Sequence, residues 1–229
     1  TGGFGVGDRH GAGSVTEPYY SDDHVTIYHG DCREILPTLR NADGSWLFDC
    51  IISDPPYGIG VQTNYRDRQR CALAVCNNYA PIHGDDEPFD PTWLLFMGVP
   101  MVLFGANHYA DALPAQASWL VWDKLDGLKS GREIGFNDQA DCELVWTNLG
   151  GPARILSQRW MGAMKSGREA SDRRVHPTQK PVELMTRIVG MTTGVVADPF
   201  MGSGTTLRAA KDLGRKAIGI EIEERYCEI

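Results

Sequence analysis

Residues 195–206, with the sequence VVADPFMGSGTT, decide the fold of this chain. The apolar residues 195–197 predict a buried strand that ends at Asp198, and the two glycines that follow predict a turn in which the backbone can approach a ligand closely. Thr205 then begins a segment with helical periodicity. A strand, a glycine turn and a helix in this order are the building unit of an α/β fold, in which ligands bind at the carboxyl ends of the strands.

Short apolar runs and amphipathic segments alternate along the rest of the chain. This pattern predicts a mostly parallel seven-stranded sheet flanked by helices, because parallel strands need the crossover connections that helices provide. We expect the other six strands at residues 25–29, 47–53, 100–105, 118–123, 142–147 and 217–220, and helices at residues 32–40, at 91–97, after Pro181 and from 205 to about 213.

The ligand expected at the glycine turn contains adenosine. Glu221 ends the strand after the turn, at about the 20-residue interval at which an acidic residue binds ribose hydroxyls. No lysine follows the glycines as it does in a Walker loop, and Leu207 stands where the dinucleotide fingerprint has its third glycine. The candidates for binding the adenosine group are therefore Asp198, the two glycines and Glu221. Neither a Walker loop nor a dinucleotide fingerprint is expected to hold this group through phosphates.

A second motif, Asp54-Pro55-Pro56-Tyr57, follows the strand expected at residues 47–53. An exocyclic amine on an aromatic base is a poor nucleophile, because its lone pair is delocalised into the ring. The Asp54 carboxylate and the Pro55 carbonyl can accept hydrogen bonds from such an amine, and two consecutive prolines fix the direction of that carbonyl. Tyr57 offers a flat face on which an extruded base can stack. The motif predicts direct methyl transfer from a sulfonium to nitrogen, with Asp54, Pro55, Pro56 and Tyr57 as the catalytic residues.

The composition is that of an ordinary globular protein, with 229 residues of which 42% are hydrophobic and 23% charged. No apolar run approaches the roughly 18 residues that span a bilayer. The first residues lack the basic and apolar regions of a secretory signal, so we expect an intracellular, cytoplasmic protein without a membrane partner. None of the six cysteines belongs to a C-x-x-C pair, and no metal is expected.

Positive charge is concentrated locally, although the net charge is −8. Two basic stretches predict contacts with the phosphates of a nucleic acid. The residues expected to make them are Arg66, Arg68, Arg70, Arg154, Arg159, Lys165, Arg173 and Arg174. A solvated loop without a partner is the alternative for the second stretch. His108, which follows the strand expected at residues 100–105, is either a contact to the target base or a structural histidine.

In its motifs and their order, the chain resembles the beta group of S-adenosylmethionine-dependent DNA amino-methyltransferases. The resemblance extends from about Val25 to Ile229 and rests on Gly30-Asp31-Cys32, Asp54-Pro55-Pro56-Tyr57, the segment from His176 to Pro181, residues 198–206 and Glu221. The catalytic motif precedes the cofactor motif, which implies the circularly permuted, Rossmann-like methyltransferase fold of that group. The resemblance also implies S-adenosylmethionine as methyl donor, DNA as substrate, and a protein of bacterial or phage-encoded type associated with restriction-modification.

The resemblance implies a role for each residue that matches the motifs of the family. Asp31 and Cys32 would lie near the adenine of the cofactor, and Glu221 would bind its ribose. Thr178 and Lys180 would approach the methionine end or the catalytic loop. The other residues expected to contact the cofactor are Asp54, Asp198, Phe200, Gly202, Ser203, Gly204 and Thr205.

The base that accepts the methyl group is the open point of the resemblance. Asp54 at the first position of its motif resembles adenine N6 enzymes, whereas Ser is commoner there in cytosine N4 enzymes. Because the same amine-binding geometry serves both bases, cytosine N4 remains the alternative. Methylation of cytosine at carbon 5 needs a Pro-Cys nucleophile, which this sequence lacks. RNA, a protein glutamine amide, and an inactive nucleic-acid-binding scaffold are the remaining alternatives.

The expected domain organisation is simple. Residues 1–24 form a flexible N-terminal segment, and residues 25–229 form a single methyltransferase domain. Two small insertions for target recognition are expected at about residues 62–80 and 125–175. Because both are short, we expect a short target or loose specificity. A homodimer is an open alternative, since relatives of this group often dimerise.

Overall fold

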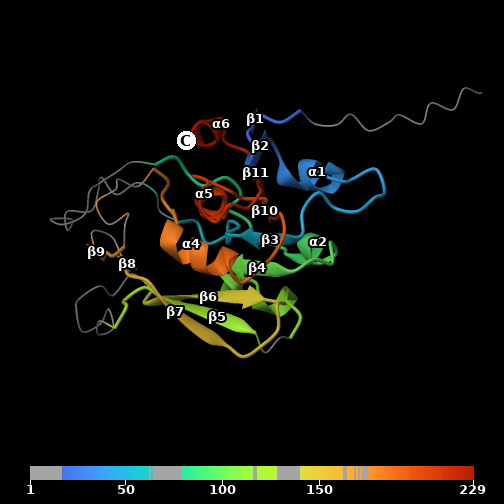
Figure 1. Ribbon diagram of the computed structural model, residues 1–229. Helices are drawn as coiled ribbons and strands as arrows, with labels where there is room; N and C mark the ends of the chain where they lie inside the picture. Colours follow the sequence, from blue (N-terminus) through green and yellow to red (C-terminus); the bar gives the residue numbers. More distant parts are fainter. Residues whose placement is uncertain are drawn as a thin grey trace, which may run out of the picture.

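A sheet forms the centre of the computed structural model, which describes residues 17–61, 63, 79–115, 118–127, 140–161, 164–167, 169, 171 and 175–229. The strand order in this sheet is β1-β2-β11-β10-β3-β4-β6-β5-β7 (Figure 1). Its strands are β1 (Tyr20–Ser21), β2 (Val25–His29), β3 (Cys50–Ser53), β4 (Met101–Phe104), β5 (Trp119–Asp123), β6 (Cys142–Thr147), β7 (Arg154–Ser157), β10 (Val196–Asp198) and β11 (Ala217–Glu221). Five of the eight pairings are parallel, so the mostly parallel α/β sheet predicted from the sequence is confirmed.

The strand number differs from the prediction at the two edges of the sheet. The seven central strands are those expected from the sequence, and β1 and β7 extend the sheet to nine. Strand β1 has two residues and lies inside the N-terminal segment expected to be flexible, where it pairs with β2. Strand β7 lies inside the second expected insertion and pairs in parallel with β5. Both were missed because a two-residue strand and the sequence RILS carry too little alternation to indicate a strand.

The helices are short. They are α1 (Cys32–Ile35), α2 (Thr92–Leu95), α4 (Val182–Val189), α5 (Thr205–Asp212) and α6 (Glu224–Cys227), with the 3-10 turns η1 (Leu36–Thr38), η2 (Ala106–His108) and η3 (Ala110–Ala112). The helix expected at residues 32–40 is wrong in its length, because α1 gives way to η1 at Leu36. Pro37 follows at once, and its nitrogen has no proton to donate into an α-helical turn.

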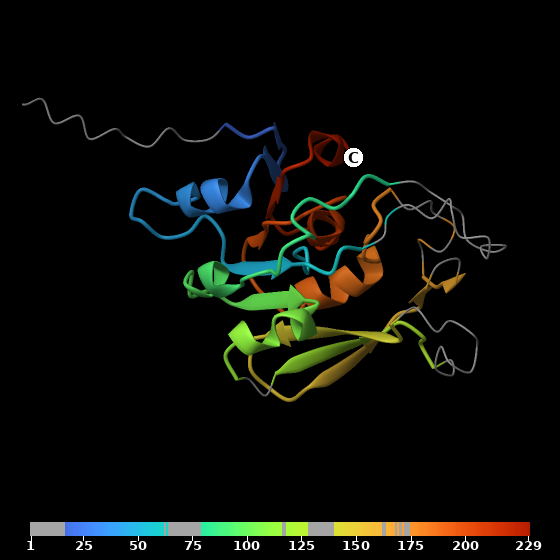
Figure 2. The same ribbon diagram turned by 180° about the vertical axis from the view of Figure 1, so that it is seen from behind.

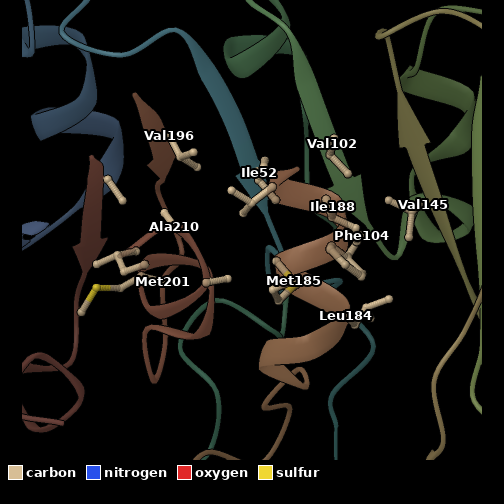
Figure 3. Close-up of a cluster of buried hydrophobic side chains, with 14 of the residues drawn as sticks. Ile52, Val102, Phe104, Val145, Leu184, Met185, Ile188, Val196, Met201 and Ala210 are labelled. Atoms are coloured by element: carbon tan, nitrogen blue, oxygen red, sulfur yellow. The ribbon is translucent and has the colours of Figure 1, made fainter. Parts of the chain in front are cut away.

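Helices cover both faces of the sheet (Figures 1 and 2). Leu184, Met185 and Ile188 of α4 are fully buried against Ile52 of β3 and Phe104 of β4, as Figure 3 shows. On the opposite face, residues of α1, η1 and α2 form a second core with the alternate side chains of the same strands, namely Cys32, Ile35, Leu36, Ile51, Leu94 and Leu103. Because both faces are covered, β3 and β4 in the middle of the sheet are buried at every position rather than at alternate ones.

Two short strands lie outside this layered core. Strands β8 (Trp160–Met161) and β9 (Met164–Lys165) form an antiparallel pair beside the main sheet. Among the residues that the structure describes, no helix is both long and apolar enough to cross a membrane.

Candidate active site

A cavity of about 770 Å³ lies at the carboxyl ends of the central strands. Its walls include the four residues of the Asp54 motif and residues of the glycine turn. Strands β3 and β10 are parallel neighbours, with Ile51 opposite Ala197, so the two motifs that follow them leave the sheet side by side. Motifs that are far apart in the sequence therefore share one cavity.

The two motifs are joined by hydrogen bonds to Asp198. The Ser53 hydroxyl, from the residue that precedes Asp54, donates to Asp198 Oδ1 at 2.6 Å. Thr206 Oγ1 donates to Oδ2 at 2.5 Å, and the Phe200 amide donates to Oδ1 at 3.2 Å. Burial raises the pKa of Asp198 to about 6, an effect that the hydrogen bonds from Ser53 and Thr206 oppose. Asp198 thus fixes the glycine turn against the strand that carries the catalytic motif.

The glycine turn is held open toward the cavity. Gly202 has a φ of 51°, in the left-handed region, and its amide donates to Glu221 Oε2 at 2.9 Å. The other carboxylate oxygen of Glu221 accepts from the Glu223 amide at 2.8 Å. Gly202, Ser203, Thr205 and Glu221 line the cavity. Gly204 is the one residue expected at the cofactor that does not line it; its φ of 75° instead places it as the N-cap of α5.

The remaining residues expected at the cofactor also line the cavity, and they come from three segments of the chain. Asp31 caps α1 by accepting from the Arg33 amide, and burial raises the pKa of the neighbouring Cys32 thiol to about 12, so that this wall is an uncharged sulfur. Phe200 packs edge-on against Phe89 at 5.6 Å between ring centroids. The residues that line the cavity from these segments are Asp31, Cys32, Thr178, Lys180, Asp198 and Phe200.

His176 also lines the cavity. It belongs to the segment from His176 to Pro181, but no role was predicted for it. Burial lowers the pKa of its imidazole to about 4, and the positive charges of Lys180 and Arg225 lower it further. The ring is therefore neutral at pH 7, and its Nδ1 accepts from the Thr178 amide at 3.3 Å. It also packs edge-on against Tyr226 at 4.5 Å. His176 orders the turn that leads to Lys180.

Asp54 lies between two donors. Its Oδ1 accepts a hydrogen bond from the Tyr57 hydroxyl, and its Oδ2 accepts one from Lys180 Nζ, 126 residues away in sequence. Burial raises the pKa of Asp54, while the positive charge of Lys180 lowers it and the negative charge of Glu143 raises it again. Tyr57 and Lys180 together hold the carboxylate in one orientation in the cavity wall.

The Tyr57 ring packs so closely against Gly105 that no side chain would fit at that position. A Cβ atom on Gly105, at the end of β4, would lie 2.0 Å from the ring. His108 stacks on Tyr57 with 5.0 Å between ring centroids and an angle of 14° between planes. His108 itself is exposed. The imidazole therefore supports one face of the tyrosine, and a contact of His108 with the target base stays a prediction.

Asp85 is a site residue that sequence reasoning missed. It is buried, and its Oδ1 accepts from the backbone amides of Tyr57, Gly58 and Ile59 at 3.1, 2.9 and 3.3 Å. Its Oδ2 accepts from the Val61 amide at 2.6 Å. The Asp85 carboxylate thus accepts hydrogen bonds from four backbone amides, those of residues 57–59 and 61, at the end of the Asp54 motif and in the loop that follows it. Nothing in the local sequence distinguishes Asp85 from its exposed neighbour Asp86.

Glu143 is the second residue that was missed. It lies in β6, and its Oε1 accepts from Lys124 Nζ at 2.6 Å. Its Oε2 lies 3.4 Å from Lys180 Nζ. Burial alone would raise the pKa of Glu143, but Lys180 and Lys124 lower it below its usual value, so this carboxylate stays charged. A single acidic residue near the start of a strand carries no sequence signal of these contacts.

Of the eight residues expected to bind phosphates, three lie among the described residues. Arg66, Arg68, Arg70, Arg173 and Arg174 lie outside the described residues. Lys165 lies in β9, beyond the end of β7, with its ammonium 4.6 Å from the centroid of the Trp160 ring, and the Trp160 indole donates to the carbonyl of Gln179, a cavity residue, at 2.9 Å. Arg159 immediately precedes β8.

Arg154 does not join this group. It is the first residue of β7, opposite Leu120 near the start of β5, whereas Ser157 at the other end pairs with Asp123. Because β5 ends at the cavity edge of the sheet, Arg154 faces the opposite edge. Arg154 therefore lies away from a ligand bound over the cavity, and its contact with phosphates stays a prediction.

Comparison with known proteins agrees with this geometry. The chain is 26% identical to the type II methyltransferase M.ScaI of Streptomyces caespitosus over 94% of its own length and 83% of that protein. It is 24% identical to M2.LlaDCHI of Lactococcus lactis subsp. cremoris over 96% of its length and 93% of that protein. The type II methyltransferase M.HpaI of Haemophilus parainfluenzae is 26% identical over 86% of this chain and 71% of that protein.

Solved structures show the same fold. The complex of M1.HpyAVI with S-adenosylmethionine matches with a TM-score of 0.52 and 25% identity, covering 89% of this chain and 96% of that one. The cytosine-N4-specific PvuII DNA methyltransferase matches with a TM-score of 0.56 and 16% identity, covering 92% of this chain and 86% of that one. The sequence profile of the N6/N4 family described as DNA methylase matches residues 114–229, which contain the glycine turn, Lys180 and Glu143. The chain belongs to this family, the N6/N4 amino-methyltransferases of DNA.

Proposed function

We propose that the protein transfers a methyl group from S-adenosylmethionine to the exocyclic N6 of adenine in DNA. The observation that carries this proposal is the shared cavity, which is lined both by Asp54, Tyr57 and Lys180 and by the glycine turn with Glu221. An amine bound at Asp54 and a methyl donor bound along the glycine turn would meet inside it. The M1.HpyAVI complex and the type II relatives support S-adenosylmethionine as the donor and DNA as the substrate.

The residues present fit S-adenosylmethionine. The cavity volume of about 770 Å³ is within the range of about 300–1,000 Å³ that small-molecule sites occupy. Acidic residues outnumber basic ones in its lining, which suits a ligand whose sulfonium and ammonium exceed its single carboxylate in charge. The acidic lining residues are Asp31, Asp54, Asp85, Asp86, Glu87, Asp198, Glu221 and Glu223, and the lysine and arginines are Lys180, Arg33 and Arg225. When bound, the cofactor supplies an electrophilic methyl group.

Several residues would hold this cofactor. We assign the ribose to Glu221, whose two oxygens each keep a lone pair beyond the amides of Gly202 and Glu223. The adenine would lie between Phe200 and the wall made by Asp31 and Cys32. The methionine end would extend along Ser203 and Thr205 toward Thr178.

Asp54 would bind the target amine. Its carboxylate oxygens accept from Tyr57 and Lys180, and each retains a second lone pair that can accept from the amine. No described group donates to the Pro55 carbonyl, which is free to accept the other amine proton. Two acceptors draw the nitrogen toward tetrahedral geometry and localise its lone pair. The pKa of Asp54, raised by burial, also makes its carboxylate a better acceptor for the proton that the methylated nitrogen sheds.

Tyr57 would stack on the base. His108 covers one face of its ring, and its hydroxyl is fixed by Asp54, so the ring is pre-oriented before any base arrives. A base that stacks on the remaining face must leave the duplex, because an exocyclic amine inside a base pair is hydrogen-bonded to its partner base. Base extrusion and amine binding would therefore occur together. The proposal that Lys165 and Arg159 bind the flanking phosphates completes the site.

The experiment that tests this function is direct labelling. The protein is incubated with methyl-labelled S-adenosylmethionine and mixed-sequence duplex DNA, and the DNA is digested to nucleosides that are identified by mass. Labelled N6-methyladenine supports the proposal. Labelled N4-methylcytosine keeps the chemistry and replaces the base, since the same two acceptors serve either amine. Binding of the cofactor without label in DNA contradicts the proposal and directs the search to RNA or protein substrates.

The Asp54→Ala variant is the matched control. It removes the amine acceptor while leaving the glycine turn untouched, so we expect no label in DNA and an affinity for S-adenosylmethionine that changes by less than threefold. Turnover close to that of the wild type would show that Asp54 does not bind the amine.

A further inference from the structure

Glu143 reaches the site because β6 runs against its neighbours. The strand pairs antiparallel with β4 and with β5, and Glu143 lies opposite Trp122. Its first residues therefore lie at the edge of the sheet where β3 and β4 end. The Glu143 side chain is only 18% exposed and does not line the cavity, so it lies behind Lys180 and not in contact with a bound base.

The two oxygens of Glu143 are in different states. Oε1 is fixed by Lys124 Nζ at 2.6 Å. Oε2 is fully buried and accepts no hydrogen bond from the described part of the chain. Lys180 Nζ lies 3.4 Å from it, too far for a charge-assisted hydrogen bond of ordinary length. A buried carboxylate oxygen without a donor is costly and calls for an explanation.

The donor that this oxygen lacks is engaged next to it. Lys180 Nζ donates to Asp54 Oδ2, and it lies 5.1 Å from the centroid of the Phe104 ring and 6.0 Å from that of Trp122. One ammonium thus lies between two carboxylates, bonded to the one that lines the cavity and unbonded to the one behind it. Its side chain is 6% exposed, so water cannot easily replace either partner.

This arrangement bears on the binding of the target amine. An ammonium on Asp54 Oδ2 draws electron density from the carboxylate, which weakens the remaining lone pair of that oxygen as an acceptor for the amine. A lysine that stays on Oδ2 would weaken the hydrogen bond between Asp54 and the target amine, although this bond has to strengthen during methyl transfer. Glu143 offers a place to which the lysine can go.

We propose that Glu143 is a positioning residue that takes Lys180 from Asp54 when the target base enters. The ammonium moves from Asp54 Oδ2 to Glu143 Oε2, and the freed Oδ2 accepts from the exocyclic amine. This step rests on the proposed function of Asp54. The shift needed is about 0.6 Å, from 3.4 Å to an N–O distance of about 2.8 Å, which a lysine side chain makes without backbone movement.

Charge balance is the same before and after the shift. Asp54 and Glu143 carry two negative charges, and Lys180 and Lys124 carry two positive ones. Lys124 keeps Glu143 in place on the far side, so the carboxylate does not have to turn to receive Lys180. Only one ammonium changes partner, and no proton is transferred.

The test is a double-variant cycle on the full chain. Glu143→Gln preserves the shape and an oxygen but removes the charge that attracts Lys180. We expect its single-turnover rate of methyl transfer to fall at least tenfold, with the affinities for S-adenosylmethionine and DNA within threefold of the wild type and an unchanged melting profile. In the Lys180→Met background no ammonium has to leave Asp54, so the same substitution should change the rate by less than twofold.

Each outcome decides the proposal. A wild-type rate in Glu143→Gln, or an equal loss in both backgrounds, overturns it, since Glu143 would then not act through Lys180. Should Lys180→Met not fold, a crystal structure of the wild type with S-adenosylhomocysteine and duplex DNA carrying the methylated site decides instead. Lys180 Nζ within hydrogen-bond distance of Glu143 Oε2 supports the transfer, and Lys180 still on Asp54 contradicts it. A wild type that labels no DNA fails the proposed function, a result distinct from all of these.

Discussion

Gly105 and Tyr57 are in such close contact that a Cβ atom on Gly105 would lie 2.0 Å from the tyrosine ring. The glycine has a φ of 64°, so its backbone and the ring beside it both require the absence of a side chain. The position of the Tyr57 ring is therefore set from the end of β4, outside the Asp54 motif itself.

Gly105→Ala should displace Tyr57 and with it the hydroxyl bound to Asp54. We expect methyl transfer to fall at least tenfold and the free energy of unfolding to fall by about 1–2 kcal/mol from the left-handed backbone alone. Gly98→Ala is the control, because Gly98 has a φ of 67° and open space around the new Cβ. It should lose similar stability and keep its rate. Equal rates in the two variants would show that Tyr57 tolerates displacement.

Asp85→Asn should loosen the loop that follows the catalytic motif. The amide retains one acceptor but presents an NH₂ group where the Val61 amide donates at 2.6 Å. We expect the free energy of unfolding to fall by about 1.5–3 kcal/mol and the turnover number to fall more than the affinity for the cofactor. Thermal unfolding and steady-state kinetics measure both. The same change at the exposed Asp111 should alter neither; a turnover number unchanged in Asp85→Asn would mean that the loop does not need this anchor.

Gly202→Leu should close the cavity to the cofactor. Gly202 lines it with a φ of 51°, so a leucine strains the backbone and projects bulk toward His176, another residue of the cavity lining. We expect the affinity for S-adenosylmethionine, measured by calorimetry, to fall at least tenfold. Gly214→Leu has a similar backbone cost, at a φ of 69° with open space, and should bind normally. Normal binding in Gly202→Leu would remove the glycine turn from the cofactor site.

Asp198 should make stability depend on pH. Its pKa in the folded protein, about 6, lies above the value of about 3.8 expected when unfolded, so the folded state binds the proton more tightly. The stabilisation is fully present below the unfolded pKa and is lost as the pH rises through 6. The difference in unfolding free energy between wild type and Asp198→Asn should therefore decline by at most about 3 kcal/mol from pH 4 to pH 7. A difference that stays constant across this range would refute the assignment.

Lys165 and Arg154 should behave differently toward DNA. Lys165→Met removes one phosphate contact, which should lower affinity at low salt and reduce the slope of log K against log salt concentration by about 1. Arg154→Met removes the same charge at the opposite edge of the sheet and should leave the slope unchanged. Titration of fluorescent duplex DNA at several salt concentrations measures both slopes. If the two variants behave alike, the phosphates do not run over the cavity edge.

The central sheet and the cavity lining could be predicted because their signals are local. A run such as residues 100–105 is apolar over the length of one strand, and the glycine turn and the Asp54 motif are each contiguous. Parallel strands then deliver both motifs to one edge of the sheet, so eleven of the twelve residues expected at the cofactor line the same cavity. The cap position of Gly204 depends on a backbone angle that its sequence context does not fix.

Asp85 and Glu143 could not be predicted in the same way. The partners of Asp85 are backbone amides some 24 to 28 residues earlier in the chain, and amides carry no sequence signature. The partners of Glu143 come from two other elements, and an isolated acidic residue in a sequence is indistinguishable from a solvated one until the fold buries it. Buried polar pairs of this kind belong to the tertiary structure and not to any motif.

The antiparallel direction of β6 brings the charge behind Asp54 onto the same segment of the chain as residues proposed for target recognition, so the two would be inherited together. Lys124 follows β5 and Glu143 is the second residue of β6, so both belong to one antiparallel pair of strands that are consecutive among the described strands. A recombination event that exchanged this pair of strands between relatives would carry the Lys124–Glu143 pair along with whatever target preference the intervening residues confer. Changes in specificity and changes in the charge behind Asp54 would then arrive in descendants together.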